Sequence, residues 1–289
     1  MRFKPRRSAL YIPGSNKRAL EKAVSLAADV VILDLEDAVS PDNKIQARAQ
    51  LLDTLGRQDF GEREVVVRIN GLDTDWGVAD LAAFHDAGID ALLLPKVERP
   101  DQIEHAESLM SDHHYDSSIG LWAMIETPLA IIQVNDICQA SDRLNALVMG
   151  TSDLAKELRV PHTRDRTAFL YALSRCVLAA RAFGLDIIDG VCLDLDDESG
   201  YAQGCCQGRE LGFDGKSLIH PKQIALANHY FSPSEESVAF AKKIICAWES
   251  SENKGVLVVD GKLVEYLHVL EAKRTLEISR LIAGRSSAQ

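Results

Sequence analysis

The sequence lacks an apolar run long enough to cross a membrane. No stretch approaches the roughly 18 to 20 consecutive apolar residues that a spanning helix needs. Residues 1–7 are basic, but a strand-like segment with polar residues follows them, rather than the apolar region of a signal peptide. We therefore expect no membrane partner and a cytoplasmic location.

Basic residues are in the minority. The chain of 289 residues has 32 Lys and Arg against 43 Asp and Glu, which gives a net charge of −11. Such a charge argues against general nucleic-acid binding, because phosphate backbones are held mainly by Lys and Arg. A local basic patch for an anionic ligand remains compatible with it.

Several familiar catalytic and metal-binding patterns are also missing. The six cysteines show no metal-ligand spacing, so we expect reduced thiols, mostly packed in the core. Neither a Gly-x-Ser-x-Gly elbow, a P-loop nor a Gly-x-Gly-x-x-Gly turn occurs at a position where it could form a catalytic or phosphate-binding site. Lys96 is the one lysine placed to form a Schiff base, and nearby acids favour a role as their charge partner.

Two apolar segments that end in acids carry the strongest signal. Residues 120–125 form an apolar run that stops at Glu126, Thr127 and Pro128, and residues 145–149 lead in the same way to Asp153. Short apolar runs bounded by Gly and Pro are typical of strands buried on both faces. The carboxyl ends of such strands carry the active sites of parallel α/β proteins.

The whole chain predicts an α/β fold, a TIM (β/α)8 barrel with a C-terminal helical and hairpin extension. Eight strand-then-helix units fit into about 230 residues, which is the usual barrel length. We expect the helix after the sixth strand to be delayed to residues 167–183 by an inserted loop at residues 160–166. Residues 1–230 would be the catalytic barrel. Residues 231–289 would be an extension on this barrel or a neighbour's, with a hairpin at Asp260-Gly261. The predicted strands are residues 8–13, 29–37, 64–70, 91–97, 120–125, 145–149, 186–193 and 216–220.

Polar residues gather at the predicted strand ends, and we expect them to converge at one mouth of the barrel. They are Glu36, Asp37, Arg68, Asn70, Lys96, Glu126, Asp153, Asp189 and His220.

Glu126 and Asp153 have no His or Cys partner in this pattern, which favours a hard, oxygen-preferring ion such as Mg²⁺. The alternative is that Arg68 or Lys96 neutralises both acids. Arg68 has a planar fork that suits a substrate carboxylate, and a salt bridge to Glu36 or Asp37 would be compatible with that role.

A second cluster is basic. Tyr11, Gly14, Lys17, Arg18 and Lys22 surround a predicted helix start, and Arg18 and Lys22 share one helix face. This face would suit the phosphates of a nucleotide-bearing ligand, or it is a solvated basic surface.

Six short segments, taken in order, resemble the citrate lyase β-subunit-like family of the HpcH/HpaI aldolase superfamily. The resemblance implies a magnesium-dependent barrel, assembled as a trimer or hexamer, that cleaves a 3-hydroxy-3-carboxy acyl thioester. The segments are residues 7–14 (RSALYIPG), 33–39 (LDLEDAV), 67–70 (VRIN), 94–98 (LPKVE), 125–127 (IET) and 215–221 (GKSLIHP).

The resemblance also implies roles for single residues. Glu126 and Asp153 fall on the metal ligands, Arg68 and Glu126 on substrate-binding positions, and Tyr11, Arg18 and Lys22 near positions that hold CoA. Catalysis is expected from Arg68, Glu36, Asp37 and Glu265. Relatives carry an aspartate where this chain has Glu265. The catalytic role is therefore assigned here to a side chain that is one methylene longer.

Four functions stay open at this level. The first is a lyase acting on citramalyl-CoA, malyl-CoA or methylmalyl-CoA that releases a 2-oxo acid and an acyl-CoA. The second is the β subunit of citrate lyase, whose thioester sits on an acyl-carrier protein. The third is a non-catalytic barrel that binds a thioester or partner subunit, and the fourth is an aldolase on free hydroxy acids.

Overall fold

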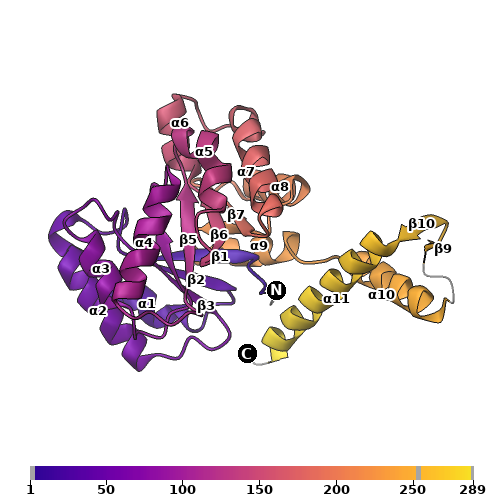
Figure 1. The fold of residues 1–289 in the computed structure, drawn as a ribbon, viewed down its shortest axis with the longest axis horizontal. Coiled ribbons are helices and arrows are strands. Elements are labelled where there is room, and N and C mark those ends of the chain that lie inside the picture. Colours follow the sequence, from indigo (N-terminus) through magenta and orange to yellow (C-terminus); the bar gives the residue numbers. More distant parts are fainter. Residues whose placement is uncertain (1–3, 252–254, 288–289) are drawn as a thin grey trace. The chain divides into compact units, whose positions relative to one another are not determined.

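The computed structural model describes residues 4–251 and 255–287, which divide into two compact units (Figure 1). Residues 6–230 form the first unit. The second comprises the described part of residues 1–5 and 231–289.

The first unit is a closed barrel of eight parallel strands, so the predicted TIM-barrel fold is confirmed. Strands neighbour one another in sequence order, and β1 pairs with both β2 and β8 to close the ring. The strands are β1 (Ser8–Pro13), β2 (Val30–Asp34), β3 (Glu64–Arg68), β4 (Ala91–Leu94), β5 (Gly120–Ile125), β6 (Leu144–Met149), β7 (Asp186–Asp189) and β8 (Gly215–Leu218).

Almost every strand residue is buried, because one side of each strand faces the barrel interior and the other lies under helices. Inside the barrel, Trp122 packs with Ile32, Val66, Leu93 and Val148. The polar residues at the strand ends therefore lie above a packed apolar interior of the barrel.

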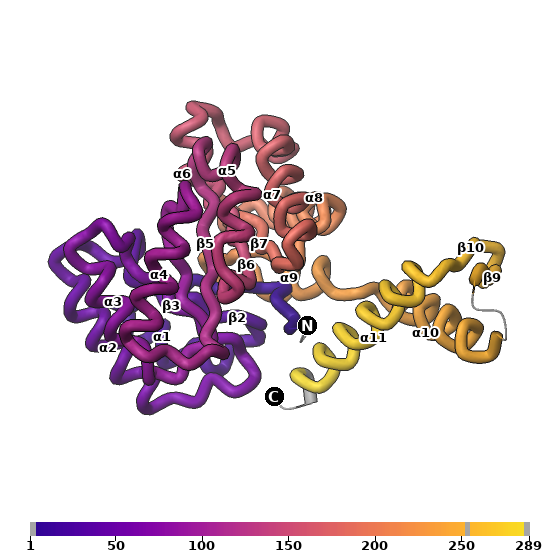
Figure 2. Tube along the Cα trace, viewed as in Figure 1, coloured from indigo at the N-terminus to yellow at the C-terminus, as the bar shows by residue number. Residues whose placement is uncertain are grey.

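Helices surround the strands (Figures 1 and 2). They are α1 (Lys17–Ala23), α2 (Lys44–Arg57), α3 (Gly77–Ala83), α4 (Pro100–Asp112), α5 (Pro128–Cys138), α6 (Thr151–Leu158), α7 (Leu170–Ala182), α8 (Glu198–Leu211) and α9 (Ile224–Tyr230). Short 3₁₀ turns η1 (Pro41–Asn43), η2 (Thr167–Phe169) and η3 (Pro221–Gln223) precede α2, α7 and α9.

The prediction of a delayed helix after the sixth strand was wrong. Helix α6 begins at Thr151, directly after β6, and ends before Arg159, which is left-handed at φ 58°. The expected loop at residues 160–166 then leads to α7. Asp153 consequently lies in the first turn of a helix rather than at a strand tip, where the positive end of the helix dipole favours an acid.

Arg6 ties the amino-terminal ends of the strands together. Its guanidinium forms ion pairs of 2.7 Å with Glu64 on β3 and 2.7 Å with Asp186 on β7, and it lies over the ring of Trp122. These contacts cover the end of the barrel opposite the polar strand ends.

The second unit is a helix pair with a hairpin. Helices α10 (Glu235–Ser250) and α11 (Tyr266–Ser287) pack together around Ile244, Trp248 and Val269. Strands β9 (Val256–Val259) and β10 (Lys262–Glu265) pair antiparallel, and Asp260 and Gly261 between them both have positive φ. This is the predicted hairpin, and its turn has the left-handed conformation that an Asp-Gly pair favours.

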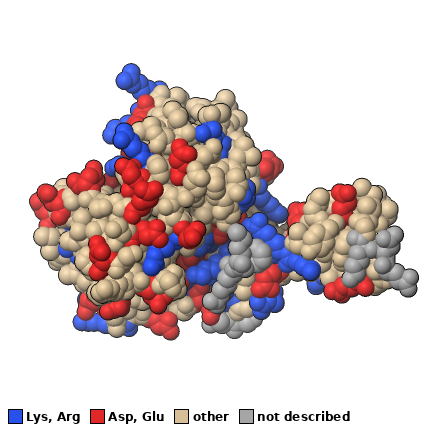
Figure 3. Space-filling model, in the orientation of Figure 1, with Lys and Arg blue, Asp and Glu red and all other residues tan. Residues whose placement is uncertain are grey.

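Charged side chains of both signs are interspersed over the described residues on the face drawn in Figure 3. Among the helices of the described residues, none has the length and apolar character that a bilayer span requires. All six cysteines are free, and only Cys138, Cys176 and Cys205 are fully buried. The expectation of mostly core cysteines thus holds for half of them.

Candidate active site

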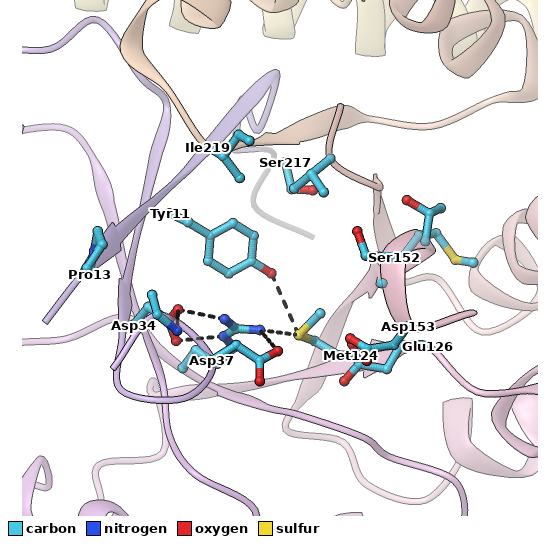
Figure 4. A pocket seen from close by; sticks show the side chains of 16 residues that line it. Tyr11, Pro13, Asp34, Asp37, Met124, Glu126, Ser152, Asp153, Ser217 and Ile219 are labelled. Atoms are coloured by element: carbon cyan, nitrogen blue, oxygen red, sulfur yellow. Dashed lines mark hydrogen bonds and ion pairs between the residues drawn. The ribbon is translucent and has the colours of Figure 1, made fainter. Parts of the chain in front are cut away.

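A pocket of about 350 Å³ lies at the carboxyl ends of the barrel strands (Figure 4). Its walls come from β1, β2, β3, β5, the β6–α6 junction and β8. The polar residues that line it are Tyr11, Asp34, Asp37, Arg68, Glu126, Thr151, Ser152, Asp153 and Ser217. Four of the nine predicted strand-end residues meet here, namely Asp37, Arg68, Glu126 and Asp153.

Glu126 follows the last residue of β5 and is 1% exposed. Its Oε1 accepts a 2.8 Å hydrogen bond from the backbone N–H of Lys96. Burial raises the pKa of Glu126 from its ordinary 4.5 to about 7, although the Lys96 N–H and the charge of Arg68 act to lower it. The charge of Asp153 raises it further. A cation beside this carboxylate would therefore be strongly favoured.

Gly150 makes room for the Glu126 side chain. A Cβ at position 150 would overlap the Cβ and Oε2 atoms of Glu126. The N–H of Gly150 also donates to the carbonyl of Ile125 at 3.1 Å, which joins β5 to the start of α6. A residue without a side chain is thus needed where the two acid-bearing segments meet.

Arg68, the last residue of β3, is held rigidly at the pocket wall. Its Nε and Nη2 donate to the two oxygens of Asp34 at 2.7 and 2.6 Å, and its guanidinium lies 4.8 Å from the ring centre of Tyr11. Burial acts to lower the pKa of Arg68, but Asp34 more than reverses this effect, so the guanidinium stays charged. Asp34, only 1% exposed, is the partner that the sequence did not single out.

The third nitrogen of Arg68 faces the acids expected to be catalytic. Nη1 lies 3.1 Å from Glu36 Oε2 and 3.9 Å from Asp37 Oδ2, and Lys96 Nζ lies 3.1 Å from Glu36 Oε1. Burial raises the pKa of Glu36 even though Arg68 opposes it. Asp37 is more than half exposed. Lys96 is therefore a charge partner of Glu36, as its surroundings in the sequence indicate.

These pairings leave Glu126 and Asp153 without a cation from the protein. Arg68 is committed to Asp34 and Glu36, Lys96 Nζ is committed to Glu36, and no ion pair reaches Glu126 or Asp153 from the described residues. The alternative that Arg68 or Lys96 neutralises the two acids is thus not supported.

The donor set fits magnesium. The described residues contain no group of three or more His, Cys, Asp or Glu side chains able to hold a metal. Mg²⁺ does not require one, because it commonly binds one or two carboxylates and completes its octahedron with water and substrate oxygens. Glu126 and Asp153 are two such carboxylates, adjoining one pocket and near enough for Asp153 to raise the pKa of Glu126.

Three predicted mouth residues have other partners. Asn70 donates to Asp80 at 2.6 Å, and His220 caps the turn η3 by accepting from the Lys222 N–H. Asp189 is fully buried between Arg166 and Lys216, at 2.7 and 2.9 Å. Four of the nine predicted residues thus line the pocket, whereas these three are held by partners within the protein.

The basic cluster divides in two. Tyr11 lines the pocket, and its hydroxyl lies 3.7 Å from the sulfur of Met124. Arg18 and Lys22 are exposed on α1 and line none of the pockets described here. Gly14 is needed because a Cβ there would press on the carbonyl of Asp34, so its close approach is to β2 rather than to a phosphate.

A larger groove, of about 960 Å³, shares Asp37 with the pocket. Six carboxylates line it against Lys44, Lys96 and one histidine, so its charge does not suit phosphates. The exposed cations of α1 remain the better candidates for them. Glu265 ends β10 in the second unit with an exposed side chain, and its role in catalysis stays a prediction.

Comparisons with known proteins identify the family of the chain. The chain is 50% identical to a (3S)-malyl-CoA thioesterase of Cereibacter sphaeroides, over 97% of this chain and 96% of that protein. It is 36% identical to the citrate lyase subunit beta of Leuconostoc mesenteroides subsp. cremoris, over 95% and 93% of the two chains.

A solved structure of CitE from Mycobacterium tuberculosis, in complex with magnesium, acetoacetate and coenzyme A, matches with a TM-score of 0.76 and 30% identity. The match covers 96% of this chain and 98% of that one. The sequence model of the HpcH/HpaI aldolase/citrate lyase family matches residues 7–221 of this chain. The chain therefore belongs to the HpcH/HpaI aldolase/citrate lyase family, a family of carbon–carbon lyases, as the resemblance predicts.

Proposed function

We propose that this protein is a magnesium-dependent lyase that cleaves a malyl-class 3-hydroxy-3-carboxyacyl-CoA into a 2-oxo acid and an acyl-CoA. The observation that carries the proposal is the pair Glu126 and Asp153, two carboxylates that no cation of the described residues pairs with, beside a fixed and charged Arg68. The magnesium and coenzyme A in the related CitE structure support it.

Glu126 and Asp153 would hold the ion. Bound there, Mg²⁺ would supply a Lewis acid that lowers the pKa of the substrate hydroxyl and stabilises the developing carbonyl. The N–H of Lys96 fixes one oxygen of Glu126, and Gly150 keeps the space around that carboxylate open.

Arg68 would stabilise the negative charge that develops on the acyl half of the substrate. Asp34 fixes its plane, so the guanidinium needs little reorganisation when negative charge forms nearby. Tyr11 covers one face of the guanidinium and excludes water there. Glu36 and Asp37 lie beside Nη1 of Arg68 and are candidates for moving a proton, and Glu265 is the third candidate.

The exposed face of α1 would hold the phosphates of CoA through Arg18 and Lys22. Both side chains are exposed, and neither forms an ion pair with the described residues.

A second candidate reaction is hydrolysis of the thioester. The 50% identical relatives are named for that activity toward (3S)-malyl-CoA. Both reactions would begin with the hydroxy-acid end of the thioester bound in the same way. They differ in whether the carbon–carbon or the carbon–sulfur bond breaks. The β-subunit relatives keep a third option open, a thioester carried by an acyl-carrier protein.

One assay separates these reactions. Malyl-, citramalyl-, methylmalyl- and citryl-CoA, and a citryl thioester of an acyl-carrier protein, are incubated with the purified protein and Mg²⁺, with and without EDTA, and the oxo acid and free thiol are measured. A lyase gives oxo acid without free thiol, whereas a thioesterase gives free CoA without oxo acid. Turnover that EDTA does not reduce, or none with any thioester, would refute the proposal. Activity that appears only with a carrier-protein thioester would support the citrate lyase subunit.

A further inference from the structure

A second pocket, of about 430 Å³, adjoins the candidate active site. It shares Thr151 and Val191 with the first pocket and lies between the segment after α6 and the start of α8. Arg166 and Lys216 line it. The proposed reaction uses neither of these cations.

Arg166, Lys216 and Asp189 form a buried cluster with one positive charge in excess. Arg166 Nη1 donates to both oxygens of Asp189 at 2.7 Å, and Lys216 Nζ donates to Oδ2 at 2.9 Å. Burial acts to raise the pKa of Asp189, but the two cations hold it below its usual value, so this acid is charged. One carboxylate thus faces two cations, and Lys216 is only 2% exposed.

The cluster also has donors to spare. Arg166 gives its Nε to Gln207 at 2.6 Å, but its buried Nη2 has no acceptor among the residues that the structure describes. Lys216 Nζ donates to Asp189 and to the Gly190 carbonyl at 2.6 Å, which accounts for two of its three N–H bonds. A buried donor without an acceptor is destabilising, and more so when it is charged.

The other acids of the pocket are already engaged. Asp197 pairs with Arg164 at 2.8 Å and accepts from the Gly200 N–H, and Asp194 accepts from the N–H groups of Asp196 and Asp197. Neither of them forms an ion pair with Arg166 or Lys216 within the described ranges.

We propose that Arg166 and Lys216 form a binding site for the carboxylate of a small organic acid. A single carboxylate balances the excess charge and supplies the missing acceptors. Its two oxygens can accept from Arg166 Nη2 and from the remaining N–H of Lys216 Nζ. Phosphate, with more oxygens and charge, would need more donors than this cluster has left. The carboxylate belongs either to a separate acid or to a far carboxylate of a substrate that reaches over from the first pocket.

The direct test is calorimetric titration of the full-length protein with L-malate in EDTA. The wild type is expected to bind, and Arg166→Gln, which keeps the Asp189–Lys216 pair, is expected to bind at least about tenfold more weakly because a charged hydrogen bond is lost. The matched control Arg164→Gln removes an exposed cation of the same pocket and should change the affinity less than about threefold. Absence of binding to the wild type, or equal binding by Arg166→Gln, would overturn the proposal. Binding that needs Arg68 instead of Arg166 would also overturn it.

A second measurement needs no variant. Cys192 lines this pocket, and Cys246 is exposed on α10 as an internal reference. L-malate should slow alkylation of Cys192 by iodoacetamide at least about threefold and leave Cys246 unchanged. Inorganic phosphate at the same ionic strength should not protect Cys192. No protection by malate, or equal protection by phosphate, would refute a carboxylate site.

Kinetics would then identify the source of the carboxylate, and this step alone rests on the proposed function. If the substrate supplies it, Arg166→Gln lowers kcat/KM for citryl-CoA, which has an extra carboxylate, and spares malyl-CoA. If a separate acid supplies it, malate changes turnover without competing with the thioester. Because binding and alkylation are read without turnover, a failure of the proposed reaction would not be confused with a failure of this site.

Discussion

Glu126 and Asp153 are acids without a cationic partner in the described part of the chain, and this makes them the most informative residues to change. Glu126→Gln and Asp153→Asn should each weaken Mg²⁺ binding at least about tenfold. They should lower turnover about 10²- to 10³-fold, the usual cost of losing an oriented electrostatic group. Isothermal titration with Mg²⁺ and the thioester assay give the two readouts. Asp136→Asn, on the exposed face of α5, is the matched control. Near-normal divalent-dependent turnover in both variants would show that the metal lies elsewhere.

Asp34 acts through Arg68 and is a positioning residue. Asp34→Asn should lower kcat/KM about 10²-fold, because the guanidinium loses the charged partner that fixes its plane. It should also lower the free energy of unfolding by about 3–5 kcal/mol, since a buried cation is left half-paired. Steady-state kinetics and urea unfolding measure both effects.

Asp37→Asn removes a more exposed acid 3.9 Å from the same arginine and serves as the control. It should leave stability almost unchanged. If it reduced kcat/KM as much as Asp34→Asn while the protein stayed fully stable, Asp37 would be a catalytic group in its own right.

The raised pKa of Glu126 predicts how stability depends on pH when no metal is present. A carboxyl whose pKa is higher in the folded state favours folding in its protonated form. Its contribution is therefore complete below about pH 4.5 and is lost as the pH rises through about 7. In EDTA, raising the pH from 5 to 8 should cost the wild type up to about 3 kcal/mol more than Glu126→Gln. Urea unfolding at both pH values checks this, and parallel curves for the two proteins would contradict it.

The β6–α6 junction brings the two acids together at the scale of elements. Gly150 follows the last residue of β6 and is the N-cap residue of α6, and a methyl group there would press on Glu126. Gly150→Ala should lower Mg²⁺ affinity at least about tenfold and destabilise the fold by about 1–3 kcal/mol, the usual cost of overpacking.

Gly56→Ala on α2 is the matched control, because a Cβ at position 56 meets nothing within 4 Å. It should be neutral or slightly stabilising. Thermal unfolding with and without Mg²⁺ gives the measurement. Full metal affinity in Gly150→Ala would mean that Glu126 does not need this space.

The elements show what the sequence can and cannot predict. The barrel could be predicted from buried strands that end in polar residues, because apolar runs and their ends are local signals. The helix at Thr151 was missed because Gly-Thr-Ser resembles a loop, although Asp153 in its first turn was an available sign. Pairing between segments is different. Arg68 with Asp34 on the neighbouring strand, and Arg166 with Asp189, join residues 34 and 23 positions apart, and only the folded chain brings them into contact.

At the scale of the whole molecule, Glu265 would act either on its own barrel or on that of another copy, and the two cases predict different results. Glu265→Gln should lower turnover about 10²-fold if it is an acid or base. Glu126→Gln should be similarly inactive because it loses a proposed ligand of the metal ion. Mixing the two variants under exchange conditions restores activity if the acid comes from a second copy and restores none if it acts within its own chain.

Light scattering tests the expected trimer or hexamer independently. A monomer of full activity would exclude an acid supplied by a neighbouring copy. Unchanged turnover of Glu265→Gln would exclude this residue altogether.

The ring closes where β1 meets β8, and Ser8 pairs there with Lys216, 208 positions later in the chain. During synthesis the first strand to leave the ribosome must wait for the last before its second edge is covered. An uncovered strand edge can pair with another chain, so the nascent protein is exposed to aggregation until residue 218 has emerged. Arg6 cannot complete its ion pairs until Asp186 has followed Glu64, so this end of the barrel becomes secure only late in translation.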